Sequence, residues 1–446
     1  MPAIAEDRDA YRASFERFAA AHAASDPAWL RERRTAAIAR FVEKGLPTAR
    51  DEAWRHTPVA PLARPCFEPA DPEAEAPSAA LAAVSLEGFP GPRLVFVNGR
   101  FSPGLSSARP ASGVEVTSLR ELLRTEPGRL EPWLSRLATG QAGVFADLNS
   151  AFAEDGAVVI VAPGAHPEDA VLVGHVAAGN GAPTVSYLRT LVVAGAGSRC
   201  RVVEAFASPD GSASLVNAVT EVVVEDGARV DHYKLQREGE DQLHVATLAA
   251  RLARDARFSD HSLALGAALS RNDIDVRFEG EGGECTLDGL FVLDGRRVAD
   301  THSRIDHARP HCSSREHYRG IVDGQGRGIF NGLVVVRPGA QKTDAYQMNQ
   351  NLLLSRQALV HSTPQLEILA DDVKCKHGST TGQLDAAALF YLRSRGLSEG
   401  AARSLLTWAF ASDLVRKMEI GPLRRVVERH LQAHLPDASG LAEALP

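Results

Sequence analysis

Cys375 and His377 are the sharpest chemical feature of the chain, within residues 371–378. If this stretch is a β-strand, side chains two residues apart point to the same face. A thiolate and an imidazole on one face can bind a soft metal such as zinc or iron, and flanking Lys374 and Lys376 would favour the thiolate. Closed structural sites usually have four ligands, so this is at most half a metal site. Spacing alone favours the alternative, a buried cysteine and an exposed histidine with no joint role.

A second group of metal-ligand types falls within about one repeat of the chain: His302, His307, His311, Cys312 and His317. Their spacing matches no HExxH or CxxC motif. Acidic residues and arginines are interleaved with them, namely Asp300, Arg304, Asp306, Arg309, Arg315 and Glu316. This mixture favours a hydrogen-bonded polar ladder over a metal centre, and both interpretations stay open.

Signatures of two common nucleotide-binding classes are missing. No GxxxxGK[ST] loop is present, so we expect no ATP to be bound by this chain in that manner. Residues 324–328 are rich in glycine but lack the dinucleotide-binding spacing, and we expect a turn there. The neighbouring Asp371 and Asp372 would point to opposite faces of a strand, which is unfavourable for acid–base catalysis. These residues therefore give no support for either nucleotide-binding class or for catalysis by paired carboxylates.

Composition indicates the cellular location and the classes of partner of the protein, but says little about its fold. The 446 residues carry a net charge of −7, which gives no electrostatic reason to expect a nucleic-acid partner. The first residues do not resemble a signal peptide, and no apolar run reaches the roughly 18 residues of a membrane span. Five widely spaced cysteines do not make a disulfide framework. Cys66, Cys200 and Cys285 are expected to be small buried residues. We expect a cytoplasmic protein without nucleic-acid or membrane partners.

Residues 155–383 are a succession of short β-type runs separated by glycine and aspartate. Residues 227–233 align with residues 255–261, an offset of roughly 28 residues, and units near Gly283 and His311 follow at about that offset. A turn followed by a short strand at a fixed period is typical of a solenoid, because each coil stacks on the next. We predict a mainly β fold, a right-handed parallel β-helix, with a β-sandwich as the alternative.

Residues 1–64 are expected to be an N-terminal helical region. Tyr11, Phe15 and Phe18 lie on one face of a helix, and residues 37–42 repeat this apolar spacing. Two helices ahead of the β region are therefore predicted.

Residues 65–154 are predicted to be a linker and a mixed α/β segment. The first part is rich in Pro, Ala and Glu, and a strand then runs into a turn at Asn98 and Gly99. Residues 384–446 are predicted to be helical again, with Ser398 as an N-cap. This tail either caps the open end of the solenoid or docks a partner.

Several stretches resemble the SufB/SufD family of iron–sulfur cluster assembly scaffolds. They span roughly Trp54 to Met418 in the family order, namely residues 265–273, 300–307, 312–320, 342–355 and 395–398. Lys-Cys-x-His-Gly at residues 374–378 is similar to the SufD branch rather than the SufB branch. Residues 51–58 resemble an N-terminal element of that branch, although His56 stands where Tyr or Phe is usual.

The resemblance implies a right-handed parallel β-helix between helical ends. It also implies a non-catalytic scaffold in a SufB–SufC–SufD complex, paired with SufB through the β-helices, with the SufC ATPase docked on the C-terminal helices. Cys375 and His377 would then contribute to a transient iron–sulfur cluster or iron at the SufB interface. A homodimer of the isolated chain and the binding of a flavin are left open.

Three alternatives are compatible with the residues. The chain could be a SufB-type paralogue or homomeric scaffold. A β-helix enzyme acting on polysaccharide would usually carry rows of carboxylates or aromatics, whereas the aromatic content here is 6%. A metal-dependent hydrolase would use the group from His302 to His317.

Overall fold

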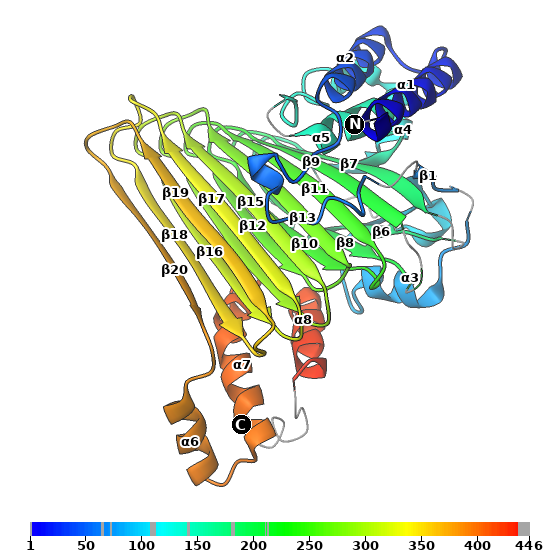
Figure 1. Cartoon of the computed structure of the whole chain (residues 1–446). Helices are drawn as coiled ribbons and strands as arrows, with labels where there is room; N and C mark the ends of the chain where they lie inside the picture. The colour runs from blue at the N-terminus through cyan, green and yellow to red at the C-terminus, as the bar shows by residue number, and fades with distance from the viewer. Residues whose placement is uncertain are drawn as a thin grey trace.

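The centre of the molecule is a parallel β-solenoid (Figure 1). The computed structural model describes residues 2–63, 67–71, 74–107, 113–140, 143–179, 183–209, 211 and 214–435, with side chains from residue 8 onward. Each coil contributes one strand to each of two ten-stranded sheets, so odd-numbered and even-numbered strands stack separately. The predicted parallel β-helix is confirmed, and a β-sandwich is excluded because strands pair in parallel along both stacks.

The odd-numbered stack consists of β5 (Gly156–Val161), β7 (Thr184–Ala194), β9 (Ser214–Val224), β11 (Leu243–Leu252), β13 (Leu269–Phe278), β15 (Val298–His307), β17 (Arg327–Val336) and β19 (Leu359–Ile368). The even-numbered stack consists of β6 (Val171–Val176), β8 (Arg199–Ala207), β10 (Arg229–Arg237), β12 (Arg257–Ala264), β14 (Glu284–Leu293), β16 (Ser313–Val322), β18 (Asp344–Leu353) and β20 (Lys374–Gly382). Val, Ile, Leu and Phe from alternate positions fill the space between the sheets.

The strand register largely agrees with the repeat in the sequence. Arg229 pairs with Arg257, as the first alignment predicts. Arg257 then pairs with Glu284 rather than with Cys285, so the third unit is shifted by one residue. Glu284 pairs with Ser313, which restores the expected register in the fourth unit. Because side chains alternate, the shift turns Cys285 into the core, where it is buried.

Helices at the N-terminus cover the outer face of the odd-numbered sheet. They are α1 (Pro2–His22), α2 (Ala28–Lys44) and α5 (Val144–Phe152), with the short η1 (Glu52–Trp54) after α2. Phe15 and Phe41 pack with α5 against strand residues such as Val185, which confirms the two predicted apolar stripes. Gly45 ends α2 with a positive φ of 75°, a conformation that glycine adopts without strain.

The stretch after residue 64 is more ordered than the predicted linker. It holds β1 (Glu68–Pro69), α3 (Ser78–Ser85), β2 (Arg93–Val97), β3 (Arg100–Phe101), η2 (Pro103–Leu105), β4 (Val114–Ser118), α4 (Leu119–Thr125) and η3 (Pro127–Arg129). Helix α3 corrects that prediction, because it buries Ala80 and Val84 against the even-numbered sheet. Composition alone could not reveal this, since its apolar face needs the strands for burial. Asn98 and Gly99 form the expected turn between β2 and β3.

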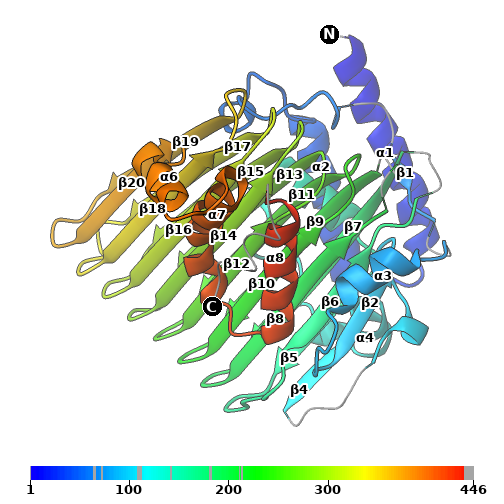
Figure 2. The ribbon, with the colours of Figure 1, turned by 90° about the horizontal axis from the view of Figure 1, so that it is seen from below.

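The C-terminal helices are α6 (Ala386–Ser394), α7 (Glu399–Arg416) and α8 (Gly421–Ala433), and Ser398 caps α7 as predicted. Helices α7 and α8 lie across the outer face of the even-numbered sheet (Figure 2), whereas α6 buries none of its residues. Leu414 and Leu423 pack against strand residues including Leu263 and Leu290. Helices α7 and α8 therefore cover a face of the solenoid and do not cap its end. None of the helices in the described ranges is long and apolar enough to cross a membrane.

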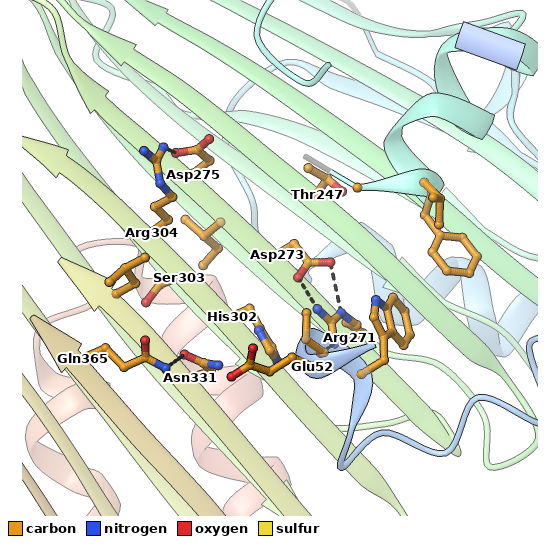
Figure 3. A pocket seen from close by; sticks show the side chains of 17 residues that line it. Glu52, Thr247, Arg271, Asp273, Asp275, His302, Ser303, Arg304, Asn331 and Gln365 are labelled. Carbon is orange, nitrogen blue, oxygen red and sulfur yellow. Dashed lines mark hydrogen bonds and ion pairs between the residues drawn. The ribbon is translucent and has the colours of Figure 1, made fainter. Parts of the chain in front are cut away.

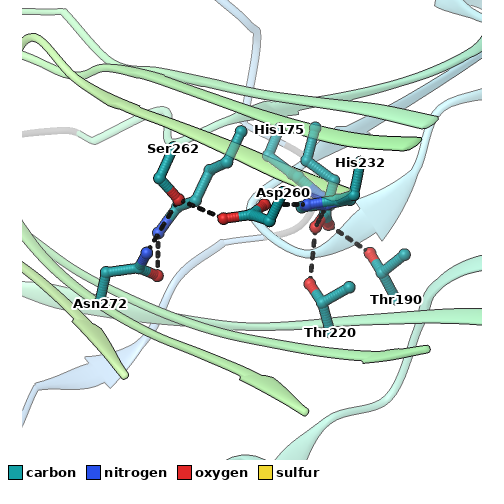
Figure 4. Close-up of polar contacts among 9 residues, drawn as sticks. His175, Thr190, Thr220, His232, Asp260, Ser262 and Asn272 are labelled. Atoms are coloured by element: carbon teal, nitrogen blue, oxygen red, sulfur yellow. Dashed lines mark hydrogen bonds and ion pairs between the residues drawn. The ribbon is translucent and has the colours of Figure 1, made fainter. Parts of the chain in front are cut away.

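A chain of buried polar side chains crosses the core between the sheets (Figure 4). Glu204 accepts hydrogen bonds from the Thr190 and Thr220 hydroxyls, both 2.6 Å long. His232 bridges Glu204 at 2.9 Å and Asp260 at 2.7 Å. Carboxylates in an apolar core are stable only when such partners compensate their charge.

The same chain continues toward later coils. Ser262 donates to Asp260 over 2.9 Å, and Asn272 donates to Ser262 over 3.0 Å. Lys234 donates to Asn272 over 3.1 Å, and burial lowers the pKa of Lys234 to about 8. Two acidic and two basic groups thus offset one another inside the solenoid.

His232 should make stability depend on pH. Burial by itself lowers the pKa of His232, but its bonds with Asp260 and Glu204 outweigh burial and raise the pKa to about 9. A raised pKa stabilises the fold below the unfolded value of about 6.5, and this contribution is lost as pH rises through 9. We expect His232→Gln to lower the free energy of unfolding by about 3 kcal/mol near pH 6, with a smaller difference from wild type near pH 10.

Urea unfolding at several pH values measures this difference. His166→Gln, in the loop before β6, is the matched control and should follow the wild-type profile. A His232→Gln profile that runs parallel to wild type across this range would contradict the assignment.

Candidate functional site

Cys375 and His377 lie on β20 in the last coil of the solenoid. Cys375 pairs with Ala345 and His377 with Gln347 of β18, both of which point into the core. The predicted strand and the shared face are therefore confirmed. Cys375 is half-buried among apolar residues such as Val334, whereas His377 is exposed, and no further coil of the described part of the chain covers it.

The pKa of the Cys375 thiol is shifted in the direction opposite to the prediction. Burial raises the pKa of Cys375, a backbone hydrogen bond at Ala345 opposes this shift, and nearby Asp344 adds to it. Lys374 and Lys376 are exposed and point away from the core, because strand side chains alternate. The prediction that these lysines favour the thiolate is wrong for this conformation, in which the thiol is the preferred form.

The second histidine group does not converge on one point. His302 faces outward and contacts Asp300 at 3.0 Å, whereas His307 is buried in the core against Ser314. Burial lowers the pKa of His307 to about 4. His317 lies on the opposite outer face, in the even-numbered sheet, 3.5 Å from Asp288. In the described ranges no three His, Cys, Asp or Glu side chains are arranged to hold a metal ion.

Several of the charged residues interleaved with these histidines form ion pairs within or between neighbouring coils. Arg304 contacts Asp275 at 3.2 Å and Asp306 at 3.1 Å, and Arg337 of the next coil also binds Asp306. Arg315 pairs with Asp344 at 2.9 Å. This geometry matches the polar ladder that the interleaved charges favoured.

A hollow of about 470 Å³ lies on the outer face of the odd-numbered sheet, beside η1 (Figure 3). Its wall includes His302 but neither Cys375 nor His377. Arg271 donates two hydrogen bonds to Asp273 and one, 2.8 Å long, to the fully buried Asp300. The hollow is therefore separate from the predicted site, and its central charges are already paired.

The same arginine anchors the N-terminal element. Arg271 donates to the carbonyl of Ala53 over 2.7 Å, and its guanidinium lies 3.9 Å from the ring centroid of Trp54. The Thr57 hydroxyl bonds to Asp300, and His56 stacks on His361 of β19 with centroids 4.0 Å apart. Residues 51–58, which sequence analysis noted only as a motif, hold the N-terminal region onto the late coils.

The other cysteines that the structure describes form no disulfide. Cys200, Cys285 and Cys312 are free and buried, as expected for the first two. Cys66 lies outside the described residues.

One motif in the tail needs its structural context. Residues 396–400 have the GxSxG spacing of a nucleophile elbow, which requires a strand before the serine. Ser398 instead follows helix α6, and its hydroxyl accepts a hydrogen bond from the Ala401 N–H over 3.0 Å. This serine caps a helix.

Comparison with known sequences adds to this geometry. Residues 175–410 match the model described as SUF system FeS cluster assembly, SufBD core domain, and residues 5–173 match the SufBD protein N-terminal region. The chain belongs to the SufB/SufD family. Members of this family take part in iron–sulfur cluster assembly, as the description of the core domain states.

Relatives cover most of the chain. The iron–sulfur cluster assembly protein SufD of Escherichia coli K12 is 33% identical over 90% of this chain and 92% of its own length. An iron–sulfur cluster assembly SufBD family protein of Synechocystis sp. is 32% identical over 85% of both chains. A second Synechocystis member of the family is 23% identical over 69% of this chain and 65% of its own. The chain is thus more similar to the first of these two Synechocystis proteins, at 32% identity, than to the second, at 23%.

Sequence reasoning missed the buried chain around His232. The available signal was the repeat itself, which already aligned His232 with Asp260. The repeat could not place Glu204 and Asn272 beside His232 and Asp260. Glu204 belongs to an earlier coil, and Asn272 belongs to the facing sheet.

The pKa of Cys375 can be tested by alkylation. We expect the iodoacetamide rate at Cys375 to reach half its maximum above the ordinary thiol value of about 8.5, because burial disfavours the thiolate. Mass spectrometry of the peptide containing Cys375 measures the rate against pH. Lys376→Gln should leave this profile unchanged, and a clear upward shift in that variant would show that the lysine does act on the thiol.

Proposed function

We propose that this chain is a non-catalytic scaffold subunit of a SufB–SufC–SufD complex for de novo assembly of iron–sulfur clusters. In this proposal it takes the SufD position, in the cytoplasm. Iron or a nascent cluster is the cargo at its interface with SufB. ATP is bound and hydrolysed by SufC and not by this chain, and flavin binding forms no part of the proposal.

The observation that carries the proposal is the uncovered last coil. Strands β19 and β20 each end their sheet, so one edge of each strand has no neighbour among the described residues. Leu359, Ile368 and Leu369 in this coil are 50%, 41% and 50% exposed. Free edges and exposed apolar residues favour pairing with another chain. A second β-helix with the same strand spacing is suited to that edge.

The position of Cys375 and His377 in this coil explains why the sequence supplies only two ligands. A partner that covers the open end would face both side chains and could add its own thiolate or carboxylate. An exposed neutral imidazole can bind iron through one ring nitrogen. The half-buried thiol of Cys375 would join only after losing its proton, which iron favours. His377 is therefore the better candidate for the first contact with iron.

The C-terminal helices are the proposed docking site for SufC. Phe390 and Tyr391 of α6 are 74% and 56% exposed, which is unusual for two adjacent aromatic side chains. Two ion pairs connect helix α7 and its C-cap to the sheet. Lys417 contacts Asp288 at 2.9 Å, and Asp413 contacts Arg319 at 3.1 Å. Motion of bound SufC subunits during the ATP cycle would be transmitted through these contacts and would open the SufB interface.

The alternatives make different predictions. A SufB-type or homomeric scaffold would prefer a copy of itself at the open end, so co-purification with SufB separates the two. A polysaccharide-cleaving or metal-dependent enzyme would need a site of its own, and no observation on the described residues favours one.

Anaerobic cluster reconstitution on the assembled complex tests the role of His377. We expect His377→Ala to slow cluster formation at least about tenfold, because it removes a proposed iron ligand, while the complex still forms. Absorption and circular dichroism of the cluster measure the rate. Lys376→Ala, on the outward face of the same strand, is the control and should assemble clusters normally. Full cluster assembly by the His377→Ala complex would contradict the role of His377 as an iron ligand and would leave this chain with a structural role only.

The two proposed interfaces can be separated by one pair of variants. Phe390→Asp should abolish co-purification of SufC and retain SufB, because the change lies on helix α6 and not on the strands of the last coil. Leu369→Asp should do the opposite, since it places a charge in the open coil. Loss of both partners in either variant, with thermal unfolding unchanged, would contradict the assignment of separate surfaces.

A further inference from the structure

A row of three polar side chains leads from the core to His377. Glu316 of β16 pairs in register with Gln347 of β18, and Gln347 pairs in register with His377 of β20. Glu316 and Gln347 are fully buried and point between the sheets. Directly paired residues on one face lie about 5 Å apart, so the imidazole of His377 is the next group in this row.

The amide of Gln347 has a defined orientation. Its Nε2 donates to Oε2 of Glu316 over 2.6 Å. Burial raises the pKa of the Glu316 carboxyl. In its ionised form this carboxylate can only accept, so the amide nitrogen is then the donor in this bond. The amide oxygen Oε1 is buried and has no hydrogen-bond partner among the described residues. An orphan acceptor of this kind costs about 1–3 kcal/mol, unless a donor reaches it.

The facing sheet makes room for this glutamine. A Cβ at Gly332 of β17 would lie 2.1 Å from Nε2 of Gln347, so a side chain there would displace the Gln347 amide from its present position. The absence of a side chain at Gly332 therefore lets Gln347 lie deep between the sheets. On the side of β18 away from β16 lies β20, and no strand follows β20 in this sheet among the described residues. His377 is the residue paired with Gln347 on that side, and its ring N–H is a donor that can serve Oε1.

We propose that Gln347 is a positioning residue for His377, with Glu316 holding the amide in place. When the imidazole turns inward, one ring N–H donates to Oε1 of Gln347. The other ring nitrogen is then unprotonated and points toward the open end, where it can bind Fe(II). Hydrogen bonds of this kind set the tautomer of metal-binding histidines. This inference rests on the proposed role of His377 in binding iron.

The tautomer of His377 tests the inference without any cluster chemistry. Two-bond ¹H–¹⁵N spectra of the full chain, labelled at histidine and assigned with His377→Ala, report which ring nitrogen carries the proton. We expect one tautomer to predominate in wild type. In Gln347→Met, which keeps the volume and removes the acceptor, the ratio should move to that of free histidine. Anaerobic Fe(II) titration of the same chain should show about 10–100-fold weaker binding.

The matched control is Gln350→Met, the same change on the same strand at an outward-facing position. It should leave both the tautomer ratio and Fe(II) binding at wild-type values. Glu316→Gln is nearly isosteric and frees the amide to rotate, so it should also weaken the tautomer preference. This variant carries the test if Gln347→Met does not fold.

The outcomes separate this inference from the proposed function. An unchanged tautomer ratio in a folded Gln347→Met or Glu316→Gln chain would overturn the positioning role. If His377→Ala binds Fe(II) as tightly as wild type, the proposed iron site fails, although a tautomer shift in Gln347→Met would still establish the hydrogen bond.

Discussion

Parallel stacking of the coils is the constraint on which the rest of the structure depends. Each strand bonds to the strand one coil earlier and one coil later, so residues about one coil apart form straight rows on each face. A row that points inward must be apolar or must supply its own hydrogen-bond partners, because no water reaches it. The choice of residue at one position is therefore coupled to positions in the neighbouring coils.

The buried chain through Glu204, His232 and Asp260 follows from this constraint. Charges that would be prohibitive alone are stable because adjacent coils supply the opposite charge in register. The same logic explains the outer ladder, in which Arg304 and Arg337 share Asp306. Of the histidines that look like metal ligands in the sequence, His317 contacts the carboxylate of Asp288 in the neighbouring coil, whereas His302 contacts Asp300 of its own strand.

The row through Glu316 and Gln347 differs because it reaches the last coil. A residue on a central strand has a paired neighbour on both sides, whereas among the described residues His377 has one on one side only. A polar side chain in such a position is held by the core and is still accessible from outside. Glu316 and Gln347 are buried and His377 is exposed at the end of the same row. Such an arrangement is suited to a site that a partner chain completes.

The sequence by itself predicted the solenoid, its helical ends, the shared face of Cys375 and His377, and the cap at Ser398, because these depend on local spacing and on a repeat. Only the tertiary structure decided the one-residue shift at Cys285, the burial of α3 and the raised pKa of the Cys375 thiol. It also decided which side chains meet across the two sheets. Contacts between facing sheets depend on how the turns orient successive strands, and no pattern within one strand contains that information.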